Sequence, residues 1–181
     1  MEKQNNLPTI AEIISGDMSI PGKLNTLNLL LNQDPPKKWI KEHPIAKGVR
    51  YLPIDKVEYL LTKIFVEWYV EVKESKLLAN SILTIIRLYY RNPVTGEICW
   101  TEGVGAAALQ VNAGEKASDF DKLKFNAVEI SAPKSKTQAI KDAAETLGKI
   151  FGKDLNRRDV LSYDDLINDT DRFKDAKFIE K

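Results

Sequence analysis

The sequence predicts an α+β fold in which a helix, three antiparallel strands and a long basic helix follow one another. Three observations support this order. Apolar residues recur at helical spacing over 54–68 and alternate over 81–91, and a lysine-rich amphipathic segment covers 133–159. We expect a helical N-terminal arm over 1–50 and a short acidic tail over 160–181, on either side of the core.

Composition places the chain among ordinary globular proteins. It has 181 residues, of which 43% are hydrophobic and 29% charged, with a net charge of +1. No apolar run approaches the roughly 20 residues that cross a bilayer, and the N-terminus lacks the layout of a signal peptide. Cys99 is the single cysteine, so no internal disulfide can form. These features predict a cytoplasmic protein with no membrane association.

The N-terminal arm, residues 1–50, carries two short apolar patterns that predict two helices. Ile10, Ile13 and Ile14 mark the first, and Leu24, Leu27, Leu30 and Leu31 mark the second. The pairs Pro21-Gly22 and Pro35-Pro36 interrupt them. We expect the arm to pack on its own domain or to take part in oligomerisation with a neighbouring subunit.

The core, residues 51–159, begins with a helix. Its apolar face is formed by Val57, Leu60, Leu61, Ile64, Phe65 and Trp68. Asp55, which follows Pro53, is positioned to cap the start of this helix. Residues 68–73 then alternate in character, which is typical of a strand.

A β-hairpin is expected next, with strands over 81–91 and 98–108 and a turn over 92–97. One face of the first strand carries Ile82, Thr84, Ile86, Leu88 and Tyr90, and the other carries Leu83, Ile85, Arg87, Tyr89 and Arg91. Residues 109–132 are polar and irregular, and a connection of that length is often functional or interfacial.

The basic segment 133–159 is predicted to be an amphipathic helix that runs into Phe151-Gly152 and buries Ile140, Ala143, Ala144, Leu147 and Phe151. It holds seven Lys/Arg and four Asp/Glu, a local charge of +3. A local excess of this kind favours a polyanionic partner, although a solvated, salt-bridged helix face is the simpler interpretation of Lys141, Glu145 and Lys149 alone.

Several classes of chemistry lack the residues they need. Neither Gly148-Lys149 nor Gly152-Lys153 belongs to a phosphate-binding loop, and one histidine (His43) with one cysteine cannot form a zinc site or a nucleophile–base pair. Glu71, Glu97 and Glu102 could hold Mg²⁺ in a nuclease, but isolated strand carboxylates are usually solvated. The sequence therefore predicts a non-hydrolytic binding protein, with no metal, cofactor or catalytic residue.

Four stretches together resemble single-strand annealing proteins of the Rad fifty-two type, including phage or prophage recombinases such as Sak. They are 51–57 (YLPIDKV), 87–91 (RLYYR), 102–105 (EGVG) and 134–142 (KSKTQAIKD), the last leading to Phe151-Gly152. Their order and spacing are similar to those of the family over roughly 60% of the chain. The N-terminal 50 residues match nothing in the family pattern.

The resemblance implies ATP-independent binding of single-stranded DNA and annealing of complementary strands in homologous recombination, by a homo-oligomeric ring or filament. It implies that Lys56 and Lys149 contact phosphates in an inner groove and that Arg91 belongs to an outer DNA site. One turn before the last basic residue of the final helix, the family has a pair of basic residues. This chain has Glu145-Thr146 at that place and so departs from the family pattern. With the local charge pattern, the expected DNA-binding set is Lys56, Arg87, Arg91, Lys134, Lys136, Lys141, Lys149, Lys153 and Arg157. A single-strand-binding protein or an exonuclease of the host or phage is a possible protein partner, in the cytoplasm of a bacterial host cell.

Two alternatives remain open from the sequence. The order helix, three strands, helix is also that of the double-stranded RNA-binding domain, whose second helix begins with a lysine-rich stretch, but that domain has a short loop where this chain has 109–132. A non-catalytic assembly or scaffold protein would also fit, with the apolar residues of the arm making subunit contacts.

Overall fold

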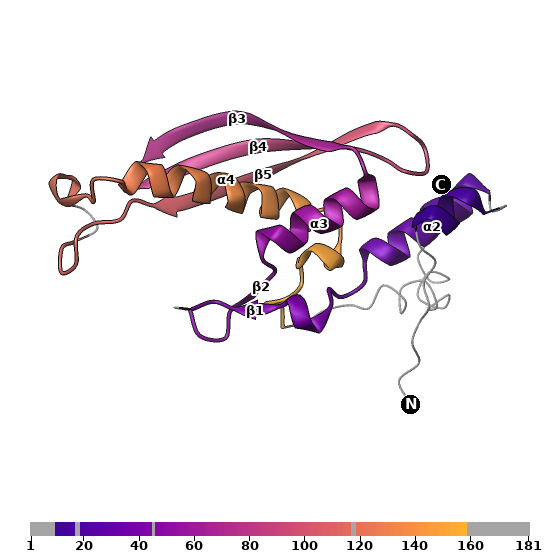
Figure 1. Cartoon of the computed structure of the whole chain (residues 1–181), viewed down its shortest axis with the longest axis horizontal. Coiled ribbons are helices and arrows are strands. Elements are labelled where there is room, and N and C mark those ends of the chain that lie inside the picture. Colours follow the sequence, from indigo (N-terminus) through magenta and orange to yellow (C-terminus); the bar gives the residue numbers. More distant parts are fainter. Residues whose placement is uncertain (1–9, 17–18, 45, 117–118, 159–181) are drawn as a thin grey trace, which may run out of the picture.

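The computed structural model describes residues 10–16, 19–44, 46–116 and 119–158, and it is an α+β fold, as predicted. A three-stranded antiparallel sheet is formed by β3 (Trp68–Leu78), β4 (Ser81–Arg91) and β5 (Ile98–Ala108), in the order β3-β4-β5. Helix α4 (Ala127–Glu145) runs beneath this sheet, and α3 (Ile54–Phe65) lies beside the end of α4 (Figure 1). Within the described residues, none of the helices has the length and apolar character that crossing a bilayer requires. The predicted acidic tail, 160–181, lies outside the described residues.

The alternation of β4 confirms the two faces expected from its sequence. Every second side chain is buried, namely Ile82, Thr84, Ile86 and Leu88. We call this side of the sheet the inner face and the opposite side the outer face. Strand β3 is longer than the predicted 68–73, because it continues past an irregularity between Val72 and Glu74 and pairs with β4 up to Leu78.

Helix α4 packs unusually close to the inner face, because both surfaces consist of small residues. The contacting stripe of the helix is Ser131, Ser135, Ala139 and Ala143, each at most 1% exposed. A Cβ added to Gly103 would overlap the carbonyl oxygen of Ala139, and one added to Gly105 would overlap that of Ser135. Backbone therefore approaches backbone here, and glycine in β5 is what permits the approach.

Helix α4 differs from the predicted helix at both ends. It begins at Ala127, so Pro133 lies inside it and not at its start. Proline inside a helix costs about 3 kcal/mol, but Ala127 packs with Ile82 and Leu109, and Ser131 Oγ donates to the Ala108 carbonyl at 2.8 Å. Tertiary packing thus overrides the local signal.

The C-terminal end of the predicted helix is also wrong. The helix stops at Glu145, and a separate 3-10 turn, η3 (Lys149–Phe151), follows Gly148. Phe151 is buried as expected, at 1% exposure, but it reaches the core from this turn. Gly152 has a φ of 101°, a left-handed conformation that favours glycine and redirects the chain after the turn.

Helix α3 buries five of the six apolar residues predicted for it, Val57, Leu60, Leu61, Ile64 and Phe65. It ends at Phe65, because Val66 adopts a φ of 60°, and Trp68 belongs to β3 instead. The predicted Asp55 cap is wrong. The N-cap position is Pro53, no side chain caps the helix, and Asp55 pairs with Lys56 at 3.0 Å.

The arm folds against the core as two helices, α1 (Ile10–Ser15) and α2 (Ile20–Leu31), and a small hairpin. Leu27 and Leu31 of α2 belong to the main hydrophobic cluster with α3 and α4. The chain then forms a 3-10 turn, η1 (Lys37–Trp39), and the hairpin of β1 (Lys41–Glu42) and β2 (Arg50–Tyr51). This hairpin lies beside the C-terminal half of α4, where the Tyr51 ring contacts the Lys141 side chain.

Candidate nucleic-acid interface

The solvent-facing stripe of α4 forms one wall of a groove of about 680 Å³. Lys134, Gln138, Lys141 and Glu145 follow one another along this stripe at helical spacing. The opposite wall is the β1–β2 hairpin, and the segment after η3 closes one end. The lining residues are His43, Pro44, Val49, Arg50, Tyr51, Val104, Gly105, Ala106, Lys134, Gln138, Lys141, Asp142, Glu145, Gly152, Lys153 and Asn156.

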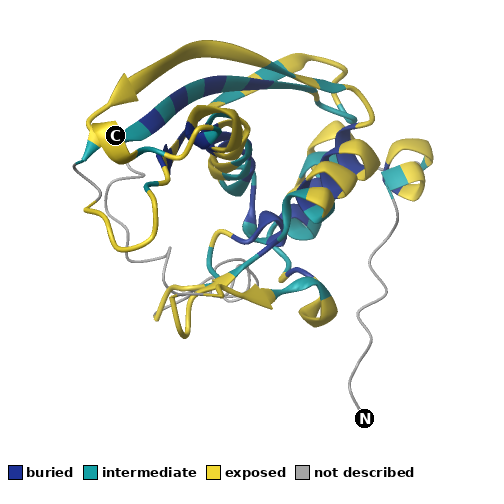
Figure 2. Cartoon of the chain, turned by 60° about the vertical axis from the view of Figure 1, so that its left-hand side comes forward, coloured by how far each residue is buried: buried dark blue, intermediate teal, exposed yellow. Residues whose placement is uncertain are grey.

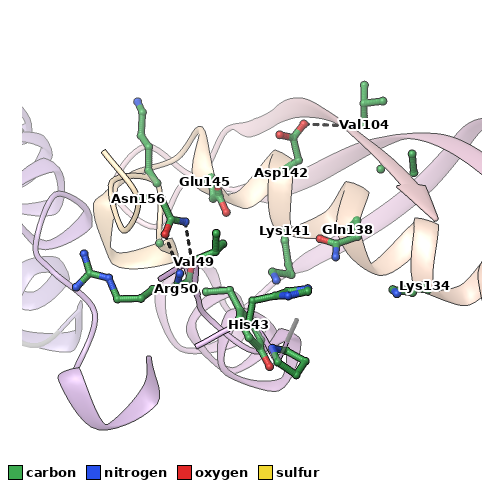
Figure 3. A pocket seen from close by; sticks show the side chains of 16 residues that line it. His43, Val49, Arg50, Val104, Lys134, Gln138, Lys141, Asp142, Glu145 and Asn156 are labelled. Atoms are coloured by element: carbon green, nitrogen blue, oxygen red, sulfur yellow. Dashed lines mark hydrogen bonds between the residues drawn. The ribbon is translucent and has the colours of Figure 1, made fainter. Parts of the chain in front are cut away.

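Figure 3 shows Lys134, Gln138 and Lys141 extending from α4 toward the side on which His43 lies. The Lys141 ammonium lies 4.8 Å from the centre of the Tyr51 ring, a cation–π contact that joins the two walls. The His43 and Tyr51 rings meet edge to face at 6.3 Å. The groove is therefore held at a defined width by side chains that come from opposite walls.

Asn156 attaches the hairpin to the segment after η3. Its side chain accepts a hydrogen bond from the Arg50 N–H at 2.7 Å and donates one to the Arg50 carbonyl at 2.8 Å, 106 positions away in the sequence. The Arg50 guanidinium also donates to the Leu155 carbonyl at 2.6 Å. These bonds place the Arg50 cation at the groove in one orientation.

The groove has mixed charge with a positive excess, since Arg50, Lys134, Lys141 and Lys153 line it together with Asp142 and Glu145. Burial lowers the pKa of Lys141, an effect that the nearby Glu145 carboxylate partly offsets. Burial likewise raises the pKa of Glu145, although the Lys141 charge opposes this. Asp142 is engaged, because one of its oxygens accepts the Val104 N–H of β5 at 2.9 Å.

A second groove, of about 500 Å³, lies on the other side of Arg50, which lines both. Its cations are Lys37, Lys41, Arg50 and Lys149, and its carboxylates are Asp34, Glu42 and Asp154. Asp154 is only 12% exposed and holds two cations, Lys149 at 3.6 Å and Arg157 at 3.2 Å. The Lys149 charge is therefore already compensated within the chain.

The structure brings some of the predicted residues together and separates others. Lys134, Lys141 and Lys153 share the first groove, and Lys149 lines the second, with Arg157 beside it on Asp154. Lys136 is exposed on α4 but lines neither groove. Lys56 lies 5.8 Å from the Trp39 ring and also lines neither groove.

Arg87 and Arg91 lie on the outer face of the sheet, away from both grooves. Each makes an ion pair at 2.6 Å, Arg87 with Glu102 and Arg91 with Glu67. The hydrogen bond from Arg91 lowers the pKa of Glu67, so this carboxylate is ionised when it holds the arginine.

Sequence reasoning missed the contribution of the arm, which supplies Lys37, Lys41 and Arg50 to the two grooves. A signal was present, because residues 37–50 contain five Lys/Arg and one Glu, a denser positive charge than that of the basic helix. This stretch has no amphipathic period that would place its cations on one face of a helix or strand. Asn156 has no local signal at all.

A scan of the chain against models of known protein families finds no match, and a search of curated proteins finds none either. The resemblance to annealing proteins of the Rad fifty-two type therefore rests on the four sequence stretches. Within the described residues, His, Cys, Asp and Glu do not gather in threes that could hold a metal ion.

Proposed function

We propose that this protein binds single-stranded DNA and anneals complementary strands without nucleotide hydrolysis, as a homo-oligomer acting in homologous recombination. The observation that carries this proposal is the groove on α4, in which cations from the arm, from α4 and from the segment after η3 converge. The sequence resemblance supports the same function. In this proposal the protein works in the cytoplasm of a bacterial host cell, and a single-strand-binding protein or an exonuclease is its partner.

Annealing requires no covalent step, because the duplex is the more stable product. The protein has to neutralise the backbone charge and to present the bases to a second strand. In this proposal the phosphates lie along Lys134 and Lys141, and Arg50 leads them toward Lys37 and Lys41 in the second groove. The carboxylates Asp142 and Glu145 oppose the phosphates, so each subunit binds weakly and an assembly binds strongly.

The decisive test is the annealing of two complementary labelled oligonucleotides over a range of salt, with neither nucleotide nor metal present. We expect acceleration well above the spontaneous rate that falls as salt rises, because phosphate contacts release counterions. Absence of acceleration by folded protein would overturn the annealing proposal. A competition between single-stranded DNA and duplex RNA tests the alternative binding module, and failure to bind either would favour the scaffold.

A further inference from the structure

The first groove carries positive charge that the described part of the chain leaves largely uncompensated. Arg50, Lys134 and Lys153 form no ion pair with any described residue. The Glu145 carboxylate partly offsets the charge of Lys141. On the outer face of the sheet, by contrast, both arginines are paired with glutamates at 2.6 Å. An anion that enters the groove therefore meets cations that no described carboxylate holds.

The groove is also accessible from solvent along both walls. Lys134 and Gln138 of α4 are exposed, and the hairpin is exposed over 41–44 and 46–50 (Figure 2). An extended chain can therefore enter the groove from the side, along the stripe of α4 that forms its wall.

The opposite charge is concentrated in one stretch of the sequence, residues 159–171, which we call the acidic segment. It contains five aspartates and no Lys or Arg, and it lies outside the described residues. Since the whole chain has a net charge of +1, the rest of the chain carries +6. A chain whose charges are divided in this way attracts its own acidic part to its basic surface. The aspartates are Asp159, Asp164, Asp165, Asp169 and Asp171.

The described chain reaches the acidic segment from the groove itself. Gly152, Lys153 and Asn156 line the groove, and Asn156 is fixed there by its two hydrogen bonds to Arg50. Asp159 follows Asn156 by three positions. The acidic segment therefore begins within about 10 Å of a residue that lines the groove.

The acidic segment is long enough to follow the groove past all of its cations. Lys134 lies eleven positions before Glu145 on α4, which corresponds to roughly 16 Å of helix. Thirteen extended residues span at most about 45 Å. Attachment at one end also gives the aspartates an effective concentration of roughly millimolar size, so contacts that are individually weak can fill the groove.

The second groove is a poorer fit for the acidic segment. The first groove has four cations and two carboxylates, whereas the second has four cations and three carboxylates. One of these carboxylates, Asp154, also compensates Lys149 at 3.6 Å. An acidic chain is therefore attracted more strongly to the first groove than to the second.

We propose that the acidic segment docks in the first groove of its own chain and competes there with single-stranded DNA. The docking follows from the charges and the attachment point, and it stands without the proposed function. The competition rests on the proposed function, because DNA is the polyanion that the docked segment excludes. DNA then has to displace the segment, so its apparent affinity falls by the factor by which the docked form outnumbers the open form.

The docking contact is tested without DNA, by joining carboxylates to lysines with a carbodiimide, which adds no spacer, and identifying the joined peptides by mass spectrometry. Lys134 is the informative position, because it is the groove cation farthest along α4 from the attachment point. Lys136 is the matched control, since it is exposed on the same helix but lines neither groove. An equal mixture of isotopically labelled and unlabelled protein distinguishes links within one chain from links between copies.

We expect the acidic segment to be cross-linked to Lys134 within one chain, several times more often than to Lys136. The link should disappear at high salt, which screens the contact. Equal linking to the two lysines, links to Lys134 only between copies, or no link to Lys134 would each overturn the inference.

Anisotropy with labelled single-stranded DNA tests the competition. In one variant, asparagine replaces the five aspartates of the acidic segment, so the length of the segment is kept. A charge-matched control replaces five exposed carboxylates that line neither groove and form no ion pair with a described residue. These substitutions are Glu58→Gln, Glu97→Gln, Glu115→Gln, Asp121→Asn and Glu129→Gln. Circular dichroism establishes that each variant is folded.

We expect the asparagine variant to bind DNA roughly tenfold more tightly than the wild type, as for a docked form that outnumbers the open form by about ten to one. The control should bind less than about twofold more tightly, because charges farther than about 8 Å from the strand are screened at physiological salt. Equal affinities of the two variants would overturn the competition. The two proposals fail separately. A link to Lys134 in a chain that does not bind DNA refutes only the proposed function, and annealing by a chain that lacks this link refutes only the docking.

Discussion

The two long faces of α4 differ in how tightly they pack and in how far they are exposed to solvent. The packed face, Ser131, Ser135, Ala139 and Ala143, is dry and rests on glycines of β5 with no room for another atom. The groove face, Lys134, Gln138, Lys141 and Glu145, is partly solvated and is opposed by a hairpin from a distant part of the chain.

This difference separates stability from binding within a single helix. On the packed face, the shape of the helix backbone decides which residues are allowed, so a substitution there should change the free energy of unfolding. On the groove face, the proposed DNA binding would depend on charge and on the position of the hairpin, so a substitution there should change DNA affinity with little change in stability. Four variants test this division.

The largest effect on stability is expected from Gly105→Ala, in the part of β5 that contacts the packed face of α4. Its methyl group would overlap the Ser135 carbonyl and the Ala139 nitrogen, which are backbone atoms that cannot rotate away. We expect a loss of about 3 kcal/mol in the free energy of unfolding, at the upper end of the range for overpacking. In a chain of this size such a loss lowers Tm by roughly 10 °C, which calorimetry and urea unfolding can measure.

Ala106→Val is the matched control for Gly105→Ala. Ala106 is the next residue of β5, it is exposed, and its side chain points to the outer face. The added methyl groups meet solvent there, and valine suits a strand, so stability should change by less than about 0.5 kcal/mol. Equal effects of the two substitutions would contradict the close approach of α4 to β5.

The same division explains which features could be predicted from the sequence. Helix α3 and strand β4 were recognisable because their buried side chains recur at a fixed period. The start of α4 was missed because Pro133 signals a boundary locally, while the packing of Ala127 that overrides this signal is tertiary. Periodicity reports only contacts that one element makes along its own length.

The candidate site was predictable only in part for the same reason. Local charge identified Lys134, Lys141 and Lys153 as members of one site. The opposite wall depends on the bond between Arg50 and Asn156, which lie 106 positions apart, and no local pattern records such a pairing. Charge also pointed to Lys136, which the helix turns away from the groove.

The double variant Lys134→Ala/Lys141→Ala should have the largest effect on the groove face. Two phosphate contacts are lost, so we expect roughly tenfold weaker binding of single-stranded DNA near physiological salt and a salt slope smaller by about 1.4. Stability should fall by at most about 1 kcal/mol, through the lost contact between Lys141 and Tyr51. Anisotropy titrations at several salt concentrations measure both quantities.

Lys136→Ala controls for the loss of a lysine from α4 outside the groove. Lys136 is exposed on the same helix and lines neither groove, so its removal should leave the salt slope within error of the wild type. If Lys136→Ala weakened binding as much as the loss of a groove lysine, the whole helix and not the groove would be the binding surface.

Asn156→Ala should have a smaller effect on DNA binding. It tests the position of Arg50 without changing the charge of the groove. It removes the two hydrogen bonds that hold Arg50 but removes no charge. We expect a loss of about 1 kcal/mol in stability and roughly threefold weaker DNA binding, with an unchanged salt slope. Asn126→Ala is the control, because Asn126 precedes α4 and its side chain makes no capping hydrogen bond. An altered slope for Asn156→Ala would mean that Arg50 leaves the groove entirely.

The smallest effect on DNA binding is expected from Glu145→Gln. Unlike the other substitutions, it should increase both stability at neutral pH and DNA affinity. Burial raises the pKa of Glu145 in the folded chain, so its ionised form disfavours folding. This penalty is complete above the raised pKa and disappears as the pH falls below the ordinary value of 4.5. Glutamine should therefore stabilise the chain at neutral pH and lose that advantage in acid, as urea unfolding at several pH values can measure.

Glu145→Gln should also tighten DNA binding by roughly two- to fivefold at neutral pH, the size of one partly solvated charge. Tighter binding would make Glu145 a residue that limits affinity in each subunit, whereas weaker binding would place the phosphates outside the groove.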